Sequence, residues 1–212
     1  MLKKFGFEIV KKGKADFILV YGGDGSILYA EREYPSIPKL VFKTSIRFRK
    51  FEYSPHQLKE ILKKVGDGNF RIQEEMKLEA TFKGKKLIAL NEFQVRVSIP
   101  TRALRFSVYV NRQAFTNLIG DGVVVSTPFG STGYYKSIGG KPFRKGIGIG
   151  FNNLHNTRVR PFVIDENLKV RIKVLREDAY LLYDNSEEFL RVRPNESLSI
   201  RKAKEKANFI LV

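Results

Sequence analysis

Apolar and polar residues follow two different periods along this chain, and the change comes near residue 70. Before that point, short apolar runs alternate with helical patterns. Strands are predicted over 17–21 and 39–42, and helices over 26–34 and 54–66. In the second helix, apolar side chains at i, i+3, i+4 and i+7 give one buried face: Leu58, Ile61, Leu62 and Val65.

After residue 70, alternation with period two predicts strands over 76–82, 93–99, 104–110 and 168–174. No Pro/Gly/Ser-rich linker separates the two parts. The predicted fold class is therefore α/β (α+β), a small N-terminal α/β sheet domain followed by a larger β-rich, β-sandwich-like domain. The predicted boundaries are 1–70 for a truncated N-terminal domain, 71–206 for the β-rich domain and 207–212 for a C-terminal strand.

Both ends of the chain carry apolar residues that need a partner. Phe5, Phe7 and Ile9 alternate and predict one short strand near the start. The tail 208–212 is apolar to its end, so we expect it to add a strand to the N-terminal sheet or to a partner subunit.

Composition narrows the function classes. The 212 residues include 39 Lys and Arg against 22 Asp and Glu, a formal net charge of +17 that favours anionic ligands of every kind. The basic residues are spread along the chain without a nucleic-acid-binding motif, so solvated faces explain them better than nucleic acid does. The absence of cysteine excludes disulfides and thiolate zinc sites. The sequence shows neither a secretory signal nor a membrane-spanning apolar stretch, and a cytoplasmic protein without a membrane partner is expected.

A glycine cluster follows the first predicted strand and opens a helix. In this segment, 22–26, the residues Gly22, Gly23, Gly25 and Ser26 would present backbone N–H groups to a phosphate or nucleotide. Asp24 would repel a phosphate unless a divalent metal lay between them, or unless it served as a base for a nearby hydroxyl. A plain glycine turn with a helix-capping Asp is the alternative.

Two further polar segments interrupt apolar strands. The stretch 120–134, Gly-Asp-Gly-Val-Val-Val-Ser-Thr-Pro-Phe-Gly-Ser-Thr-Gly-Tyr, is too rich in hydroxyls and glycines for a plain connector, and it suits a hydroxyl-rich small ligand. Upstream, Asn91 and Glu92 form a pair suited to two adjacent ribose hydroxyls, although such a pair at a strand end is also an ordinary turn.

Together these segments resemble the NAD kinase family. The resemblance covers most of residues 16 to 186 and rests on four segments in the family's order: 22–26, Leu90-Asn-Glu92, Asp121 to Tyr134, and Arg160-Pro161. The Ser-Thr-Pro-x-Gly-Ser-Thr block with Asn-Glu upstream is its most specific part, because the glycine cluster also occurs in lipid kinases.

The resemblance implies transfer of the γ-phosphoryl group of ATP, or of polyphosphate, to the 2′-hydroxyl of the adenosine ribose of NAD, giving NADP. It implies Mg²⁺ or another divalent metal as cofactor, with no protein ligand for it assigned, and a homo-oligomer, either dimer or tetramer. The nucleotide would lie in the crevice between the two parts of the chain.

By the same resemblance, Asp24 is the catalytic base. The implied NAD-binding residues are Asn91 and Glu92 for the acceptor ribose, Asp121 and Ser137 for the nicotinamide half, and Thr132, Gly133 and Tyr134 for the adenine and ribose pocket. Each has a structural alternative: Asp121 as a turn residue, Tyr134 as core, and Ser137 as a helix hydroxyl.

One segment departs from the family. Where members usually carry Gly-x-Asn-x-Gly-x-x-Gly-Phe, residues 40–50 contain no glycine. Lys43, Arg47 and Arg49 are candidate contacts to the phosphoryl donor, with a solvated basic turn as the alternative. Phe48 or Phe51 could supply the aromatic face for adenine. A second departure is Asp184-Asn-Ser, where many members have Asp-Gly-Gln.

Two other function classes stay open from the sequence. A lipid kinase of the diacylglycerol type would need an apolar slot for acyl chains and would not need Asn91 and Glu92. A non-catalytic nucleotide-binding relative, or a nucleic-acid binder, would fit the high charge and the missing glycines. Incubation with NAD against diacylglycerol, and an assay for NADP formation, separate these classes.

Overall fold

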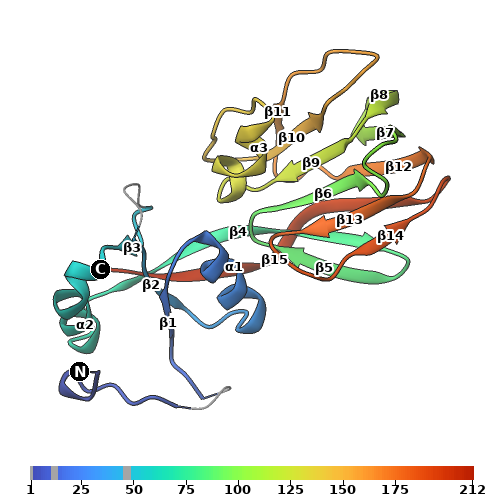
Figure 1. Ribbon diagram of the computed structural model, residues 1–212. Helices are drawn as coiled ribbons and strands as arrows, with labels where there is room; N and C mark the ends of the chain where they lie inside the picture. The colour runs from blue at the N-terminus through green and yellow to red at the C-terminus, as the bar shows by residue number, and fades with distance from the viewer. Residues whose placement is uncertain (1, 11–13, 45–48) are drawn as a thin grey trace. The chain divides into compact units, whose positions relative to one another are not determined.

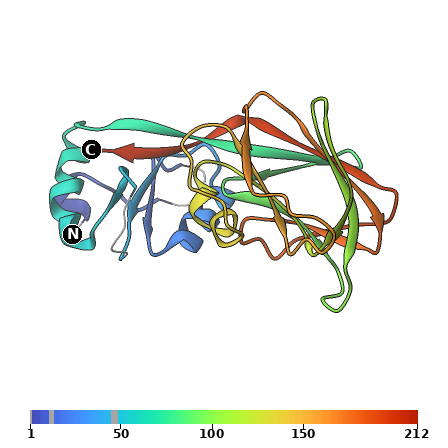
Figure 2. The same ribbon diagram turned by 90° about the horizontal axis from the view of Figure 1, so that it is seen from above.

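The computed structural model describes residues 2–10, 14–44 and 49–212. The chain divides into two compact units, Met1–Glu75 with Lys206–Val212, and Met76–Glu205. Two long strands that pair with each other, β4 (Arg71–Phe82) and β15 (Ser197–Leu211), contribute residues to both units. Figure 2 shows these two strands side by side.

The first unit is a small α/β fold built on parallel strands. β1 (Ile18–Tyr21) pairs with β2 (Lys39–Phe42), and β2 pairs with β3 (Glu52–Tyr53). Parallel neighbours need a crossover, and α1 (Asp24–Glu33) provides it between β1 and β2. The short helix η2 (Pro55–Gln57) and then α2 (Leu58–Gly66) follow β3 (Figure 1). The strand predicted over 39–42 is confirmed without a shift.

The core of the first unit lies under α2. Three of the four residues in the predicted apolar stripe are buried, and they pack with residues of β2, β3 and β15: Ile61, Leu62, Val65, Leu40, Phe42, Tyr53 and Ile210. Ser54 caps the helical segment, because its hydroxyl accepts from His56 N while Gln57 Oε1 accepts from Ser54 N. The C-terminal end of the chain belongs to this core, with Phe209 of β15 paired in parallel with Lys39.

The strand predicted from Phe5, Phe7 and Ile9 is wrong. Residues Leu2–Phe5 form a 3₁₀ helix, η1, and the following backbone turns at Gly6, whose φ is +80° and whose N–H donates to Lys3 O at 3.2 Å. A left-handed glycine interrupts an extended run, and alternation alone does not detect it. Phe5 and Phe7 pack against the core of the first unit instead.

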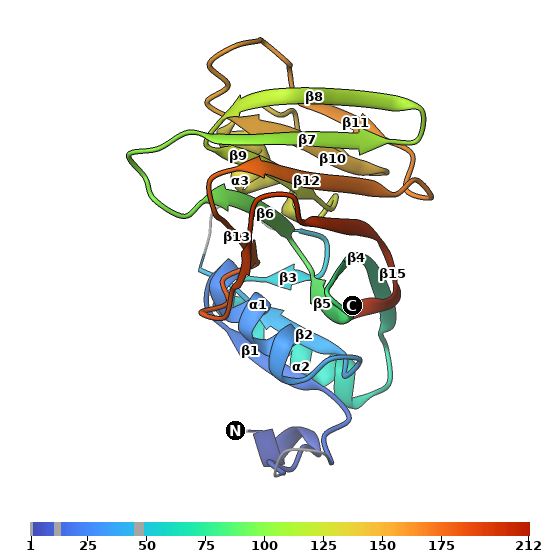
Figure 3. The ribbon, with the colours of Figure 1, turned by 90° about the vertical axis from the view of Figure 1, so that its right-hand side faces the viewer.

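The second unit is made almost wholly of antiparallel strands in two sheets. In one sheet, β12, β7 and β8 run alongside one another and β12 also pairs with β15 (Figure 3). The other sheet has the order β11-β10-β9-β6-β13-β14. The bounds are β5 Lys85–Ala89, β6 Glu92–Val97, β7 Leu104–Val110, β8 Gln113–Gly120, β9 Gly122–Ser126, β10 Ile147–Asn152, β11 Phe162–Ile164, β12 Val170–Arg176, β13 Ala179–Tyr183 and β14 Leu190–Val192.

Alternation along β6 and β9 separates a core face from a polar face. Phe93 and Val95 of β6 are buried in the core of the second unit with Val123 and Val125 of β9. Side chains point alternately to the two faces of a strand, so Glu92 and Gln94 lie on the opposite face. The register pairs Glu92 with Ser126, which places a carboxyl and a hydroxyl side by side on that face.

Two short helices follow β9, η3 (Gly130–Thr132) and α3 (Tyr134–Ser137). Residues next to and within them fill the space left by two glycines of β10. A Cβ added at Gly148 would lie 2.9 Å from the Tyr135 ring, and one added at Gly150 would lie 2.4 Å from Ile138 Cδ1. The glycines of β10 therefore let the polar segment after β9 lie directly on this sheet. Within the described residues, no helix is long and apolar enough to cross a membrane.

Replacing Phe209 by Ala should lower the free energy of unfolding by about 3–5 kcal/mol, because its ring is fully buried and leaves a cavity. The ring stacks on Phe51 with centroids 4.1 Å apart. Denaturant titration measures the change, with Phe189→Ala, at a ring that is 52% exposed, as the control. Equal losses in the two variants would contradict the assignment of the C-terminal strand to the core.

Candidate functional site

The glycine cluster of the first unit forms a tight turn between β1 and α1. Gly22 has φ +154°, and a Cβ there would lie 2.3 Å from Ser26 Oγ, so only glycine fits. Its N–H donates to Phe42 O at 3.0 Å, which fixes the turn to the end of β2. At Gly23, a Cβ would meet no described atom within 4 Å. The side of Gly23 to which a Cβ would point is therefore open.

Asp24, the first residue of α1, is held by two cations. Its Oδ1 accepts from Lys43 Nζ at 2.8 Å and from Arg49 Nη1 at 3.1 Å. Behind it lies the fully buried carboxylate of Glu52, which is 3.5 Å from Lys43 Nζ and also pairs with Arg49. We call Asp24, Lys43, Arg49 and Glu52 the Asp24 cluster. It contains two positive and two negative side chains.

Burial and charge act in opposite directions on Asp24. Burial would raise its pKa, but the hydrogen bonds and charges of Lys43 and Arg49 outweigh that effect and hold the pKa below its ordinary value. Asp24 is therefore a carboxylate at neutral pH, and both cations beside it are occupied by carboxylates.

The candidate donor residues have different outcomes. Lys43 and Arg49 lie at Asp24, where both pair with carboxylates. Arg47 and Phe48 lie outside the described residues. Phe51 is buried against Phe209, so the expectation that it could stack on adenine is wrong.

In the second unit, Asn91 and Glu92 stand where β6 begins, and Asp184 holds their backbone. Its carboxylate accepts from the N–H groups of Leu90 at 2.9 Å, Asn91 at 2.7 Å and Glu92 at 3.3 Å. Asp184 itself has φ +46°, and its N–H donates to Glu92 O at 3.1 Å. Sequence reasoning noted Asp184 only as a departure. Its place at the end of a strand, before the turn residues Asn185 and Ser186, was the available signal.

The hydroxyl-rich segment after β9 is bonded to the same turn. Thr127 Oγ1 donates to Leu90 O at 2.6 Å and accepts from Gly130 N at 3.0 Å, while Thr127 N donates to Asn91 O at 2.9 Å. A Cβ at Gly130 would lie 2.3 Å from Asn91 O. The Ser-Thr-Pro-x-Gly spacing thus serves to pack this segment on Asn91.

Three buried acceptor atoms lie at this turn without a hydrogen-bond partner among the described residues: Asn91 Oδ1, Glu92 Oε2 and Gln94 Oε1. Buried polar atoms are nearly always paired, so each of these requires an explanation. A Cβ added at Gly133 would lie 3.6 Å from Glu92 Oε2 and 4.0 Å from Asn91 Nδ2. Gly133 therefore leaves room beside these unpaired acceptors for a group that carries hydrogen-bond donors.

Glu92 is 2% exposed, and this burial is the main cause that raises its pKa to about 8. The nearby charge of Asp184 raises the pKa further, and a side-chain hydrogen bond with Gln94 lowers it. Gln94 was not predicted as a site residue. The sequence signal was a polar residue at an outward position of an otherwise apolar strand.

Of the remaining predicted NAD-binding residues, three lie near Gly133 in the chain and one, Asp121, lies at the far end of β9. Thr132 and Tyr134 are exposed and adjacent to Gly133, so Tyr134 is not a core residue. Ser137 is exposed and donates to Tyr134 O at 2.8 Å, as a helix hydroxyl does. Asp121 precedes β9, at the opposite end of that strand from Ser126, about 16 Å along it at ~3.3 Å per residue. Its Oδ2 accepts from Asn153 Nδ2 at 2.7 Å. Within one chain, Asp121 does not join the unpaired acceptors.

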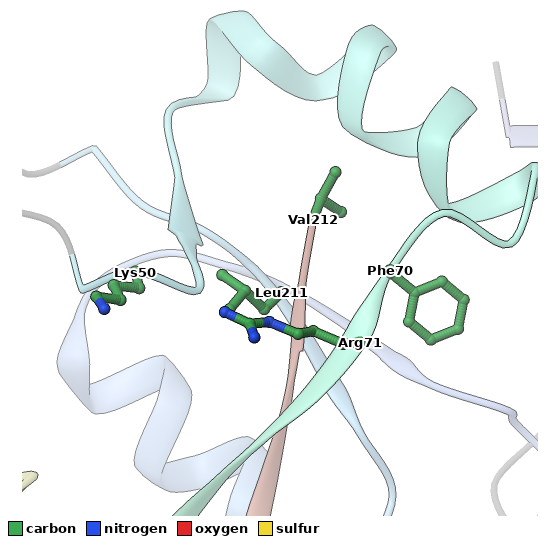
Figure 4. Close-up of a pocket in the computed structure, with 5 residues that line it drawn as sticks. All are labelled: Lys50, Phe70, Arg71, Leu211 and Val212. Carbon is green, nitrogen blue, oxygen red and sulfur yellow. The ribbon is translucent and has the colours of Figure 1, made fainter.

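Neither of two surface cavities in the structure includes a predicted site residue. One, of about 630 Å³, lies in the first unit and is lined by Lys50, Phe70, Arg71, Leu211 and Val212. Figure 4 shows the Arg71 guanidinium beside Leu211, while the Phe70 ring points away from that group. The other, of about 500 Å³, lies in the second unit between Tyr135 and the segment Arg160–Val163.

No group of three or more His, Cys, Asp or Glu side chains that could hold a metal ion occurs in residues 2–10, 14–44 and 49–212. Mg²⁺ commonly binds through one or two carboxylates together with substrate phosphates. Asp24 is the predicted site carboxylate in the first unit, and in this structure it is bonded to Lys43 and Arg49.

Comparison with known proteins identifies the family. The model of the ATP-NAD kinase C-terminal domain matches residues 90–212. The NAD kinase of Clostridium perfringens is 32% identical over 201 residues, which cover 90% of this chain and 72% of that protein. The chain belongs to the NAD kinase family. The NAD kinase of Thermoplasma volcanium is 29% identical over 208 residues, covering 92% of this chain and 74% of the relative.

Solved structures show that this NAD kinase family member has the expected fold. Yeast NADH kinase in complex with NADH superposes with a TM-score of 0.83 at 18% identity, covering 93% of this chain and 62% of the yeast chain. An Archaeoglobus fulgidus NAD kinase in complex with ATP gives a TM-score of 0.78 at 24% identity, covering 92% and 77%. The predictions of the mixed α/β fold class, of the family and of a kinase are confirmed.

Replacing Glu92 by Gln should stabilise the ligand-free protein at pH 8 and change it little at pH 4.5. The folded state raises the pKa of Glu92 from 4.5 to about 8. Between these values the unfolded chain has released the proton and the folded chain has not, so the free energy of unfolding falls as pH rises through this window. The neutral Gln escapes this loss, which for a shift of this size is roughly 4 kcal/mol at pH 8.

Urea titrations at the two pH values measure this effect. Glu187→Gln, at an exposed carboxylate of the same unit, is the control and should show no such difference. A Glu92→Gln effect of the same size at both pH values would show that the site does not force Glu92 to remain protonated.

Proposed function

We propose that this chain transfers the γ-phosphoryl group of ATP, or of polyphosphate, to the 2′-hydroxyl of the adenosine ribose of NAD. The product is NADP. The observation that carries the proposal is the pair of buried, unpartnered acceptors Asn91 Oδ1 and Glu92 Oε2 beside Gly133.

The chemistry of these acceptors selects a neutral, hydroxyl-bearing group. A phosphate would bring negative charge and no donor to atoms that lie near the carboxylate of Asp184. A ribose brings two adjacent O–H donors, which can satisfy one acceptor each. Exposed Thr132 and Tyr134, next to Gly133 in the chain, then border the adenine and ribose. Asp121 and Ser137 remain predictions for the nicotinamide half.

Asp24 supports the transfer step. The O–H bond of the 2′-hydroxyl breaks, its oxygen forms a bond to the γ-phosphorus, and the bond from that phosphorus to the bridging oxygen of the leaving ADP breaks. The proton passes to Asp24, which is ionised at neutral pH and half exposed at the start of α1. Phosphoryl transfer depends mainly on positioning and charge, so one such base is sufficient.

Two positively charged side chains support binding of the phosphoryl donor. Lys43 and Arg49 provide two cations at Asp24 for the donor's phosphates. The Archaeoglobus fulgidus relative was solved with ATP, which favours ATP as the donor here. Mg²⁺, brought by the donor, would supply positive charge to the donor's phosphates. The homo-oligomer and the cytoplasmic location stay predictions.

A lipid kinase fits this site less well. Acyl chains would leave the buried acceptors of Asn91 and Glu92 unpaired, which costs free energy. A nucleotide binder without catalysis would retain NAD binding and form no NADP with any donor. The decisive experiment is an NADP-forming assay with ATP, other nucleoside triphosphates and polyphosphate, each with and without Mg²⁺.

Replacing Asp24 by Asn should lower turnover by ~10²–10⁴-fold and leave NAD affinity unchanged, because the variant keeps the shape and removes the base. Steady-state kinetics and calorimetric titration with NAD measure the two effects. Asp67→Asn, at an exposed carboxylate after α2, is the control and should retain full turnover. Turnover within a few-fold of the parent would remove Asp24 from the mechanism.

Replacing Asn91 by Ala should weaken NAD affinity by roughly 5- to 150-fold, equivalent to about 1–3 kcal/mol for a buried hydrogen bond to a ligand. Donor affinity should change less, since Asn91 is assigned to the acceptor ribose. Titrations of NAD and of a non-hydrolysable ATP analogue compare the two. Equal losses for both ligands would contradict the assignment.

A further inference from the structure

The four members of the Asp24 cluster differ in their access to solvent. The side-chain exposed fraction is 0% for Glu52, 11% for Lys43, 23% for Arg49 and 53% for Asp24. The carboxylate of Glu52 has no access to solvent, whereas that of Asp24 is half exposed. A ligand that approaches the cluster therefore meets Asp24 before it meets the cations.

The side chains of Lys43 and Arg49 are held in position by Glu52. Both pair with Glu52, whose charge is buried and would be left uncompensated if they moved away. Arg49 also acts on the half-buried carboxyl of Glu75 in β4, where its charge opposes the effect of burial on the pKa of Glu75. Glu52 thus fixes Lys43 and Arg49 from behind. Asp24 is the partner that can be exchanged.

A phosphoryl donor brings several negative charges to this place. With Asp24 on both cations, the charges of the cluster are balanced, and an arriving phosphate meets a carboxylate. If a phosphate oxygen replaces the carboxylate oxygen on the cations, the attraction is kept and the repulsion falls, because opposite charges at about 3 Å attract strongly near a protein surface. The space before Gly23, where no described atom would meet a Cβ, gives the phosphate a path.

We propose that Lys43 and Arg49 form a clamp on Asp24 that the phosphoryl donor opens by taking over the two cations. This inference rests on the proposed function, because the donor must bind at the cluster. Glu52 is the positioning residue that keeps both cations in place during the exchange. Asp24, released from them, is then free to accept the proton of the 2′-hydroxyl. The base becomes available only when a donor is bound.

The clamp predicts that Asp24 competes with the donor. Replacing Asp24 by Asn should tighten binding of a β,γ-methylene ATP analogue by about tenfold in calorimetric titrations without NAD and without Mg²⁺. Simple repulsion between Asp24 and the phosphates would also give tighter binding. A double-mutant cycle separates the two explanations, because only the clamp acts through the cations.

The cycle repeats Asp24→Asn in a background that carries Lys43→Met and Arg49→Met. The clamp predicts that the gain falls there to less than about twofold. Arg49→Gln alone, at the more exposed cation, is a second background and should reduce the gain partly. Lys64→Met, which removes an exposed cation paired with Glu60 in the same unit, is the control background and should keep the full gain.

A gain of the same size in every background would overturn the clamp and leave simple repulsion. No gain in the parent background would overturn it as well. If the analogue binds neither the parent nor any variant, the proposed donor site fails together with the clamp. Binding to the parent without coupling overturns the clamp alone. Melting temperatures of all variants identify any that do not fold.

Discussion

The hydroxyl of Thr127 joins two segments that are 37 residues apart in the chain, and the polar face of the second unit depends on it. By donating to Leu90 O and accepting from Gly130 N, it satisfies two buried backbone groups with one side-chain atom. Asp184 completes the arrangement from a third segment. Because the backbone of Asn91 and Glu92 is satisfied in this way, their side chains are free to carry unpaired acceptors. Such acceptors persist only where the surrounding structure fixes them.

Two carboxyl groups of this protein are shifted in opposite directions by their surroundings. Glu92 is buried near another carboxylate, which favours its neutral form, while two cations favour the charged form of Asp24. Burial is the largest single effect on the pKa of both residues, and it acts to raise it. The neighbouring charges reinforce that rise at Glu92 and outweigh it at Asp24. This contrast matches the proposed roles, because a base must be ionised and a buried group that meets hydroxyls need not be.

The sequence predicts those features that depend on local periodicity. The α2 stripe and β2 follow from spacing alone, and the motifs indicate Asn91 and Glu92 as a polar pair. The sequence cannot show contacts between distant segments. The carboxylate of Asp184 binds N–H groups more than 90 residues away, and Phe51 is taken into the core by Phe209. Gly6 shows a different limit, because its left-handed turn is set by one residue within an otherwise alternating run.

The contribution of β15 to both units has a consequence for synthesis. Ile210 is buried among residues of β2 and α2, which leave the ribosome more than a hundred residues earlier. The first unit therefore cannot complete its core until β15 has been translated, although its helices and parallel strands can form before that. While it waits, the apolar edge of β2 is a transient aggregation hazard. The first unit is thus translated mostly before the second unit, but its core is completed after the second unit has been translated.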